Sequence, residues 1–361
     1  MKVGILTHHN IKNYGAYLQA YALFKIIEEL GHDVVIVNFM NILHMLANYR
    51  PFFIRKIRFG KNLMMDLRSY LQGYGQFVKF SAAMKHLSLT HPVFNASQIN
   101  ALGLDALVVG SDEVWNFRDK GYHPVKFGVG IDVPILISYA AGTGSVMPGD
   151  RFPENILEGL RRFKGLSVRE CNGGKFIQEV LGITPKLVLD PTLIYDFELE
   201  NRFSPMFTKE YILVYYCKLS HDYQKAVRDY AKKHDLIIVG AGCSDLWFDK
   251  SLINIDPFEW VGLFRNAKIV LTGTFHGTVF ASKYRRNFIS YPTSVNRMNK
   301  VQSYLRQIGL EDRMIFHSVE EFVALLDTPV DYRLFESCLL RQRESSIKFL
   351  KSVTLLRNAL S

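Results

Sequence analysis

Short apolar runs alternate along the chain with longer stretches whose apolar residues recur every three or four positions. The N-terminus shows this first, with an apolar run at residues 2–7, helical spacing from 14 to 30 and a second apolar run at 34–39. Asn13 stands where a helix N-cap is expected, and Gly31 stands where a helix commonly ends. The pattern predicts a strand, a helix and a strand, in that order.

The same alternation continues along the chain and separates into two series. The further predicted strands are 106–109, 135–140, 165–169 and 186–189 in the first series, and 211–216, 236–240, 268–272 and 287–291 in the second. Helices are expected at 223–234 and 257–265, and from about residue 320 to the C-terminus. Because strands that alternate with helices are typical of parallel sheets with crossover helices, we expect an α/β protein.

The length of the chain predicts two domains. Its 361 residues exceed what one hydrophobic core usually serves, and 48% apolar residues are ordinary for a globular protein. A polar, acidic stretch near residues 196–209 lacks strong periodicity and is the expected boundary. We place the first domain at 1–200, the second at 205–330, and C-terminal helices at 331–361.

Signals for membrane insertion, export and metal binding are not visible in the sequence. No apolar stretch approaches the roughly 18 to 20 residues that span a bilayer, and the apolar start of the chain runs into polar residues 7–10. The four cysteines lie far apart, without a C-x-x-C pair, which predicts a reducing compartment and no structural zinc. We expect a cytoplasmic protein that binds no metal.

The net charge of +10 is concentrated in one segment. Between residues 41 and 90 there are eight Lys or Arg and one acidic residue, Asp66, interspersed with apolar residues. This pattern is typical of basic amphipathic helices. It fits a solvated helical insertion, a patch that contacts anionic lipid or a lipid-linked phosphate, or a nucleic-acid arm. Because the aromatic residues lack the spacing of a base-stacking platform, we expect no nucleic-acid partner.

Candidate chemistry lies in the loops directly after the predicted strands, where ligands collect in open α/β sheets. The loop at 7–16 leads into a helix whose first residues, Asn13 and Tyr14, offer free backbone N–H groups to an anion or a sugar hydroxyl. The alternative is a capping Asn with no further role. The loop has a single glycine, so the dinucleotide-binding fingerprint is absent.

Carboxylates and small residues follow two further strands of the first series. Asp112 and Glu113 precede Trp115; acids bind hydroxyl groups and an indole stacks on a sugar ring, so this block suits a carbohydrate. An Asp that caps a helix explains the block about as well. Residues 138–145 form a small-residue turn that either brings backbone N–H groups to a phosphate or is a turn and nothing more.

An arginine ends another predicted strand of the first series. A buried arginine is costly unless it is paired, and the planar fork of Arg169 fits a carboxylate or a phosphate. The alternative is a salt bridge to Glu170 or Asp190.

Basic side chains also follow two strands of the second series. His276 is flanked by glycine and hydroxyl residues at a strand-to-helix turn, where a histidine is suited to act as a general acid. Beyond the strand 287–291 come Arg297 and Lys300. These two cations either clamp a phosphate or belong to a solvated face.

Taken in order, these blocks resemble the polysaccharide pyruvyl transferase family. The matching blocks are Asn13-Tyr14-Gly15-Ala16 with residues 18–23, 110–115, 167–170, 189–192, 275–277 and 300–305. Their order and spacing are as expected for the family from about residue 1 to 317. The resemblance implies a GT-B-like fold, with two Rossmann-like domains facing across a cleft. It also implies phosphoenolpyruvate as the donor, a saccharide as the acceptor, and no cofactor.

The resemblance assigns a role to each matching position. His276 is the expected acid, and Asp112 is expected to orient or deprotonate the acceptor hydroxyl. The expected donor-binding residues are Arg169, Lys300, Arg297, Thr274 and Gly277, and the expected acceptor-binding residues are Asn13, Tyr14 and Trp115. Thr274 replaces the serine that usually precedes Phe-His-Gly in the family.

The expected reaction forms a pyruvate ketal on a surface polysaccharide or on its lipid-linked precursor. The basic segment at 41–90 matches no family motif, and it suggests peripheral contact with anionic lipid at the inner face of a membrane. Two other functions fit the same architecture: a GT-B glycosyltransferase that uses a nucleotide sugar, with Glu259 as the candidate ribose ligand, and a non-catalytic binding protein of a polysaccharide pathway.

Overall fold

The computed structural model describes residues 1–42, 74–197, 207–314 and 317–358, with side chains up to residue 352. The chain forms two compact units. The N-terminal unit contains the described residues up to 42, residues 82–195 and those from 341 on. The C-terminal unit contains residues 74–81 and the described part of 196–340. The predicted basic segment therefore lies largely outside the described residues, at 43–73.

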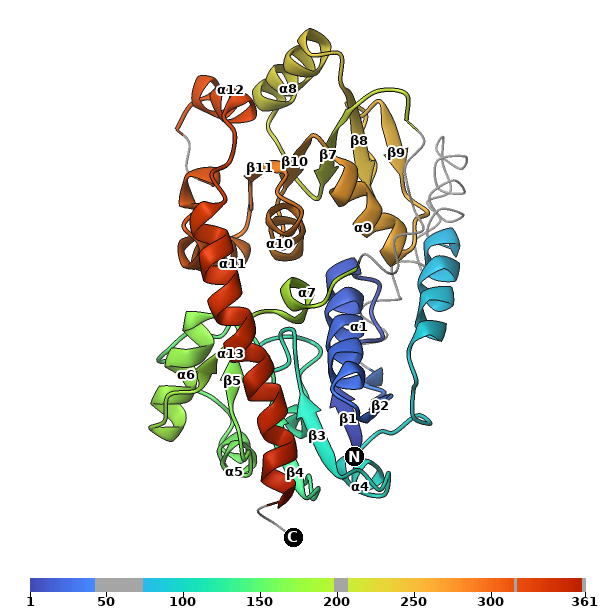
Figure 1. The fold of residues 1–361 in the computed structure, drawn as a ribbon, viewed down its shortest axis with the longest axis vertical. Coiled ribbons are helices and arrows are strands. Elements are labelled where there is room, and N and C mark those ends of the chain that lie inside the picture. Colours follow the sequence, from blue (N-terminus) through green and yellow to red (C-terminus); the bar gives the residue numbers. More distant parts are fainter. Residues whose placement is uncertain (43–73, 198–206, 315–316, 359–361) are drawn as a thin grey trace, which may run out of the picture. The chain divides into compact units, whose positions relative to one another are not determined.

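The N-terminal unit is built on a four-stranded parallel sheet with the order β2-β1-β3-β4 (Figure 1). Its strands are β1 (Lys2–Leu6), β2 (Asp33–Ile36), β3 (Ala106–Val109) and β4 (Ile135–Ser138). A short parallel pair, β5 (Ser167–Val168) and β6 (Lys186–Leu187), continues beyond β4 through isolated bridges. The predicted parallel strand–helix–strand start is confirmed, with α1 (Tyr14–Glu29) between β1 and β2.

Successive side chains of a strand point to opposite faces of the sheet, and both faces of this one are covered. On one face, Leu6, Val109 and Leu136 join a core with residues of α4 (Ala96–Asn100), η2 (Pro124–Phe127), α5 (Asn155–Arg161) and α6 (Cys171–Leu181). Elsewhere in the unit α1 packs against α7 (Pro191–Ile194). A 3-10 turn, η1 (Met84–His86), follows the helical residues 74–83.

The C-terminal unit is built on a five-stranded parallel sheet with the order β11-β10-β7-β8-β9. Its strands are β7 (Tyr211–Tyr215), β8 (Ile237–Ala241), β9 (Lys250–Leu252), β10 (Ile269–Thr272) and β11 (Asn287–Ser290). Its helices are α8 (His221–Lys233), α9 (Pro257–Asn266), α10 (Phe275–Lys283), α11 (Val295–Ile308), the 3-10 turn η3 (Glu311–Arg313) and α12 (Val319–Asp327).

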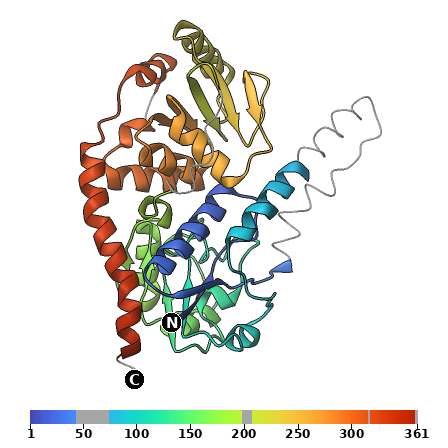
Figure 2. The ribbon, with the colours of Figure 1, turned by 45° about the vertical axis from the view of Figure 1, so that its right-hand side comes forward.

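Helices cover both faces of this second sheet. Ile212 and Val214 of β7 face a core shared with α8 and α12, whereas Tyr215 contacts the rings of Trp260 and Phe264 of α9. Figures 1 and 2 show α8 and α12 together on one side of the sheet and α9 and α10 on the other. Two covered faces are characteristic of parallel sheets, because each crossover helix must bury its apolar side.

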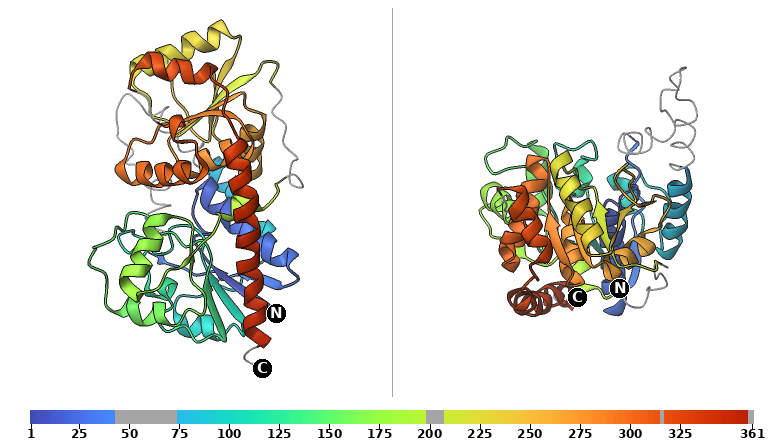
Figure 3. Two further views of the ribbon diagram at one scale, coloured as in Figure 1. Left: turned by 60° about the vertical axis from the view of Figure 1, so that its left-hand side comes forward. Right: turned by 90° about the horizontal axis from the view of Figure 1, so that it is seen from above.

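The last helix, α13 (Arg333–Asn358), begins in the C-terminal unit and ends in the N-terminal unit. In the N-terminal unit the ring of Phe349 contacts that of Tyr139, and Ser346 Oγ accepts a hydrogen bond from the backbone N–H of Leu189 at 3.0 Å. Figure 3 shows the last turns of α13 running beside the parallel sheet of this unit. Among the described helices, none combines the length and the apolar character that crossing a membrane requires.

Candidate active site

Each sheet has one point at which the chain changes direction across it. In the N-terminal unit the chain passes from β1 to β2 on one side and then to β3 on the other side of β1. In the C-terminal unit the same change occurs between β7 and β10. The carboxyl ends of the strands at such a switch point are the usual ligand sites of open α/β sheets. We describe the two edges separately.

Beyond the carboxyl edge of the N-terminal sheet, Arg169 joins two carboxylates. Its side chain is 3% exposed; Nη1 donates to Asp190 Oδ2 at 2.7 Å, and Nη2 donates to Asp112 Oδ1 at 3.0 Å. Burial alone would lower the pKa of Arg169, but the carboxylates of Asp190, Asp112, Glu170 and Glu113 together outweigh burial and raise it. Arg169 is therefore a charged crosslink between the loop after β3 and the loop before α7.

This arrangement bears on the donor-binding role predicted for Arg169. The salt bridge to Asp190 was the predicted alternative, and the bond to Asp112 adds a second carboxylate. Both terminal amino groups of the guanidinium already donate to protein oxygens. What the structure shows directly is that Arg169 orients Asp112, whose side chain is 14% exposed.

The turn at 138–145 is not the phosphate-binding loop that the sequence suggested. Glu170 Oε1 accepts hydrogen bonds from the backbone N–H groups of Thr143, at 2.8 Å, and Gly144, at 3.3 Å. The N–H groups of residues 140–142 donate to Ser167 and to the carbonyl oxygen of Asp112. Because Glu170 and its neighbours occupy these donors, the turn is an internal support for Asp112.

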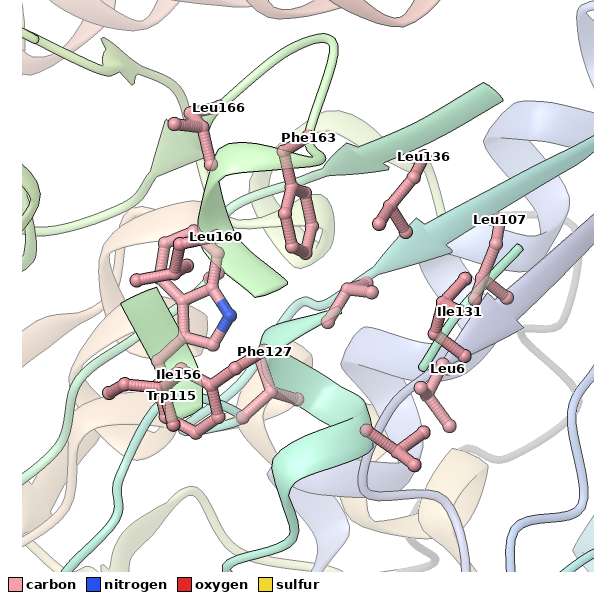
Figure 4. Close-up of a cluster of buried hydrophobic side chains, with 14 of the residues drawn as sticks. Leu6, Leu107, Trp115, Phe127, Ile131, Leu136, Ile156, Leu160, Phe163 and Leu166 are labelled. Carbon is pink, nitrogen blue, oxygen red and sulfur yellow. The ribbon is translucent and has the colours of Figure 1, made fainter. Parts of the chain in front are cut away.

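Trp115 is not an acceptor-binding residue in this structure, which corrects the sequence prediction. Its side chain is fully buried among Phe127, Leu160 and Phe163, and Figure 4 shows it inside this hydrophobic cluster. Its indole N–H donates to the backbone carbonyl of Lys126 at 3.0 Å. An indole enclosed on all sides cannot stack on a sugar ring.

The first turn of α1 carries the other two predicted acceptor residues. Asn13 is the N-cap, and its exposed side chain accepts a hydrogen bond from the backbone N–H of Ala16 at 3.2 Å. Tyr14, the first helical residue, is 2% exposed. The capping role predicted for Asn13 is confirmed, whereas the burial of Tyr14 leaves little of its ring available to a ligand.

His276 lies in the first turn of α10, at the switch point of the C-terminal sheet. It follows the N-cap Thr274, whose hydroxyl accepts a hydrogen bond from the backbone N–H of Gly277 at 3.0 Å. A Cβ at Gly277 would overlap Thr272 Oγ1. The N–H of Gly277 therefore belongs to the helix cap. Packing against Thr272 explains the glycine.

The backbones of the loops after β7 and β10 approach each other closely at this switch point. Gly273 follows β10 and donates its N–H to the carbonyl oxygen of Tyr215, and a Cβ at Gly273 would overlap the carbonyl oxygen of Tyr216. Tyr216 has a φ of 45° and is 47% exposed. Burial of its hydroxyl and the neighbouring Cys243 raise the pKa of Tyr216, while Arg297 acts in the opposite direction.

Two cations of α11 lie at the same edge as His276. β10 and β11 are paired in parallel, with Thr272 opposite Ser290, so α10 and α11 both begin at the carboxyl ends of these strands. Arg297 is exposed in the first turn of α11, near Tyr216, and Lys300 is half-buried one turn later. The structure thus assigns His276, Arg297 and Lys300 to one sheet edge, and Asp112 and Arg169 to the edge of the other unit.

Sequence reasoning missed a basic pocket at the N-terminal edge. The pocket is lined by residues 7–11, by Phe39 and Asn41, and by Lys126 of η2, and it has an empty volume of about 310 Å³. His8 and His9 stood inside a loop that was singled out for its helix N-terminus. Lys126 lies between the apolar residues Val125 and Phe127, a context that favours burial. Among the described residues, no three His, Cys, Asp or Glu side chains form a group able to hold a metal ion.

The fold places the chain in the GT-B class. Three solved structures with this fold resemble it over nearly the whole length. The glycotransferase of kitacinnamycin has a TM-score of 0.53, 12% identity, and coverage of 99% of this chain and 98% of that one. The UDP-GlcNAc 2-epimerase of Methanocaldococcus jannaschii has a TM-score of 0.51 and 12% identity, with coverage of 92% of this chain and 94% of that one. The S. aureus MnaA–UDP co-structure has a TM-score of 0.50 and 14% identity, with coverage of 94% of this chain and 90% of that one.

The family model for polysaccharide pyruvyl transferase matches residues 13–294. The chain therefore belongs to the polysaccharide pyruvyl transferase family and is an enzyme that transfers pyruvate to a polysaccharide. The match includes His276, Asp112 and Arg169, and it ends just before Arg297 and Lys300. A comparison with curated proteins found no match.

Proposed function

We propose that the enzyme uses phosphoenolpyruvate as its donor and binds it at the carboxyl edge of the C-terminal sheet. The observation that carries this proposal is the charge of the segment that forms this edge: residues 260–310 contain eight Lys or Arg and no Asp or Glu. Three of the eight, Lys268, Arg285 and Arg306, pair with carboxylates outside the segment, and Arg297 and Lys300 lie at the edge itself. Phosphoenolpyruvate carries a carboxylate and a phosphate, and an edge bearing His276, Arg297 and Lys300 suits both groups. At the N-terminal edge, by contrast, Arg169 is already paired with two carboxylates.

The proposed reaction needs one proton donor at the methylene carbon of the donor. Protonated His276 gives its proton to C3 of phosphoenolpyruvate, so C2 becomes electrophilic and an acceptor hydroxyl adds there. The C2–O bond to phosphate then breaks, and phosphate leaves with the electron pair. A second hydroxyl adds to C2 and closes the ketal. The two hydroxyl protons are released, one to His276 and one to phosphate, so the sum is donor plus diol to ketal plus phosphate.

The cations of α11 act on the leaving group in this scheme. Arg297 and Lys300 neutralise the phosphate as the C2–O bond lengthens, which stabilises the transition state more than the bound donor. The helix N-terminus of α10 adds a favourable dipole near the same position.

The N-terminal unit is proposed to hold the acceptor, a sugar of a surface polysaccharide or its lipid-linked precursor. Asp112 orients the attacking hydroxyl or relays its proton toward the departing phosphate, and Arg169 acts as a positioning residue that fixes the carboxylate. Asn13, exposed at the start of α1, contacts a sugar hydroxyl. Contact with anionic lipid through the basic segment brings the enzyme to a lipid-linked acceptor.

A nucleotide-sugar glycosyltransferase is the competing function, and Glu259 argues against it. In GT-B-like folds such a function needs a carboxylate to grip the ribose, and Glu259 was the candidate. Its Oε2 accepts a hydrogen bond from the backbone N–H of Asp256 at 2.7 Å within a capping box, and its carboxylate is ion-paired with Lys79 at 3.1 Å. These contacts leave Glu259 a structural role in α9.

The test is the affinity for phosphoenolpyruvate, measured by isothermal titration calorimetry. We expect the variant Arg297→Ala/Lys300→Ala to bind it roughly tenfold or more weakly, because charge-assisted hydrogen bonds are lost. Arg306→Ala is the matched control: Arg306 lies on the same helix, is 68% exposed and pairs with Glu311. Binding of UDP-sugars but not of phosphoenolpyruvate by the wild-type enzyme would overturn the proposal.

A further inference from the structure

The pocket beyond β1 holds a buried amine next to two buried imidazoles. Lys126 is 3% exposed, His8 is 8% exposed and His9 is 3% exposed, and all three line the pocket together with Asn10. The pocket lies at the carboxyl end of β1, beside the switch point of the N-terminal sheet. Neither the proposed donor site nor the proposed roles of Asp112 and Arg169 use these groups.

Lys126 and His8 are hydrogen-bond neighbours. His8 Nε2 lies 3.3 Å from the carbonyl oxygen of Glu113, which can only accept, and 3.4 Å from Lys126 Nζ; the tautomer with its proton on Nε2 satisfies the carbonyl. His8 Nδ1 is then an acceptor, and Lys126 Nζ donates to it at 3.1 Å and to the carbonyl oxygen of Gly121 at 3.2 Å. An ammonium group has three donors, so a further acceptor within the pocket would be bound by the third.

The charges around Lys126 leave its amine poorly compensated. Burial lowers the pKa of Lys126 to about 7, and Asp119 and Asp112 oppose the shift from outside the pocket lining. Burial and the charge of Lys126 also lower the pKa of His123. Burial lowers the pKa of His9 as well, because its effect exceeds that of the hydrogen bonds to Asn38 and Thr7, which raise this pKa. Among the described residues, those that line the pocket include no Asp or Glu.

Burying a charge is costly unless the charge is paired, so an anion in this pocket would stabilise the ammonium form. A neutral ligand would bring no such gain. With an empty volume of about 310 Å³, which includes space open to solvent, the pocket suits one terminal group more than a whole saccharide.

We propose that this pocket receives an anionic group of the acceptor saccharide, a carboxylate or a phosphate, with Lys126 as its main donor. The identity of the ligand as acceptor rests on the function proposed above, whereas anion binding by the pocket does not. The inference narrows the acceptor to a saccharide that carries an acid group on the sugar, as in a uronic acid, or a phosphate attached to the saccharide.

Three saccharide probes test the proposal by isothermal titration calorimetry: glucuronate, glucose 1-phosphate and neutral glucose. We expect the wild-type enzyme to bind at least one anionic probe and to bind glucose more weakly. Binding of glucuronate alone identifies a carboxylate as the preferred group, and binding of glucose 1-phosphate alone identifies a phosphate. Equal binding of all three probes, or binding of none, would overturn the inference.

The variant Lys126→Met removes the amine and keeps the length of the side chain. We expect it to bind the anionic probe roughly tenfold or more weakly, because a charge-assisted hydrogen bond is lost. Lys120→Met is the matched control. Lys120 is exposed in the loop preceding η2 and lies outside the pocket lining, so this substitution removes one positive charge without changing the pocket. Unchanged binding by Lys126→Met would overturn the inference.

Binding of phosphoenolpyruvate by Lys126→Met separates this inference from the proposed function. Retained donor binding with loss of the anionic probe supports both. Failure of the wild-type enzyme to bind phosphoenolpyruvate counts against the proposed donor alone, because the probes do not need it.

A measurement on the wild-type enzyme makes the test independent of any variant. The carboxylate of glucuronate stays ionised above about pH 5, so any loss of affinity above pH 7 reports on the protein. Because the anion binds the ammonium form of Lys126, we expect glucuronate affinity to fall by up to about tenfold per pH unit above the pKa of about 7. A flat profile between about pH 6 and pH 9 would contradict the inference.

Discussion

The guanidinium of Arg169 donates to Asp112 at 3.0 Å, and this bond links two residues that lie 57 positions apart in the sequence. Asp112 has a φ of 74°, a backbone conformation that few residues other than glycine adopt easily. The loop after β3 is therefore held by its surroundings. Arg169, together with the turn that Glu170 supports, keeps the carboxylate of Asp112 at the edge of the sheet.

Replacing Arg169 by Met should destabilise the protein strongly. Asp190 and Asp112 would remain without their cation, and breaking a buried ion pair from one side costs about 3–5 kcal/mol in the free energy of unfolding. Urea unfolding followed by circular dichroism measures this change. Arg162→Met is the control: Arg162 is 42% exposed and pairs with the 88% exposed Asp132, so its loss should cost less than about 1 kcal/mol. Equal losses in both variants would contradict the crosslink.

Replacing His276 by Gln should separate chemistry from donor binding. Loss of a general acid lowers turnover by about 10²- to 10⁴-fold, while phosphoenolpyruvate, held by Arg297 and Lys300, should keep most of its affinity. Phosphate release with a panel of saccharides measures turnover, and calorimetry measures affinity. His221→Gln is the control, because the side chain of His221 is 90% exposed on α8. Turnover of His276→Gln at the wild-type rate would remove His276 from the mechanism.

Strands and the first helix could be predicted from the apolar pattern because local sequence decides them. The strand 106–109 was predicted with its observed bounds, and Asn13 was predicted to cap α1. The strand predicted at 34–39 ends at Ile36, since Phe39 pairs instead with Val93 in an isolated bridge. β9 was missed because its three residues, Lys250–Leu252, form an exposed edge strand without an apolar pattern.

The candidate site was less predictable, since it depends on contacts between distant residues. The sequence offered Glu170 or Asp190 as partners of Arg169, and only the folded sheet brings Asp112 to the same guanidinium. Trp115 looked like a sugar platform because burial cannot be read from a single residue type. Lys126 was overlooked because lysines are rarely buried, so a buried lysine is not expected from the residue type.

Anionic lipid should retain the enzyme through the basic segment at 41–90. We expect binding to vesicles of phosphatidylglycerol and phosphatidylcholine at low salt and release at high salt, because salt screens the attraction. Replacing Arg55, Lys56, Arg58 and Lys61 by Gln should weaken it by about 1 kcal/mol for each charge near the surface.

The control for membrane binding changes the same number of charges elsewhere. Lys225, Arg228, Lys232 and Lys233 are exposed on α8 and can all be replaced by Gln. Vesicle sedimentation compares the two variants. Equal weakening would show that net charge, and not the segment, drives binding; salt-independent binding would contradict the electrostatic explanation.

The buried amine of Lys126 should make the stability of the protein depend on pH in a characteristic way. Its pKa is about 7 in the folded state and about 10.4 in an unfolded chain, so between these values the unfolded state binds the extra proton. The wild-type free energy of unfolding therefore carries a penalty that is complete below pH 7 and is relieved as the pH rises toward 10. Lys126→Met lacks this penalty, and it should be more stable than the wild type by the largest amount near pH 6.

That advantage should shrink by about 1.4 kcal/mol per pH unit between about pH 7 and pH 10, the slope that a single proton gives. Urea unfolding of both proteins across this range measures it. Lys120→Met should run parallel to the wild type, because Lys120 is exposed in the loop preceding η2 and lies outside the pocket. A constant difference between Lys126→Met and the wild type would mean that Lys126 is not held as a desolvated amine, and the electrostatic basis of the anion pocket would be lost with it.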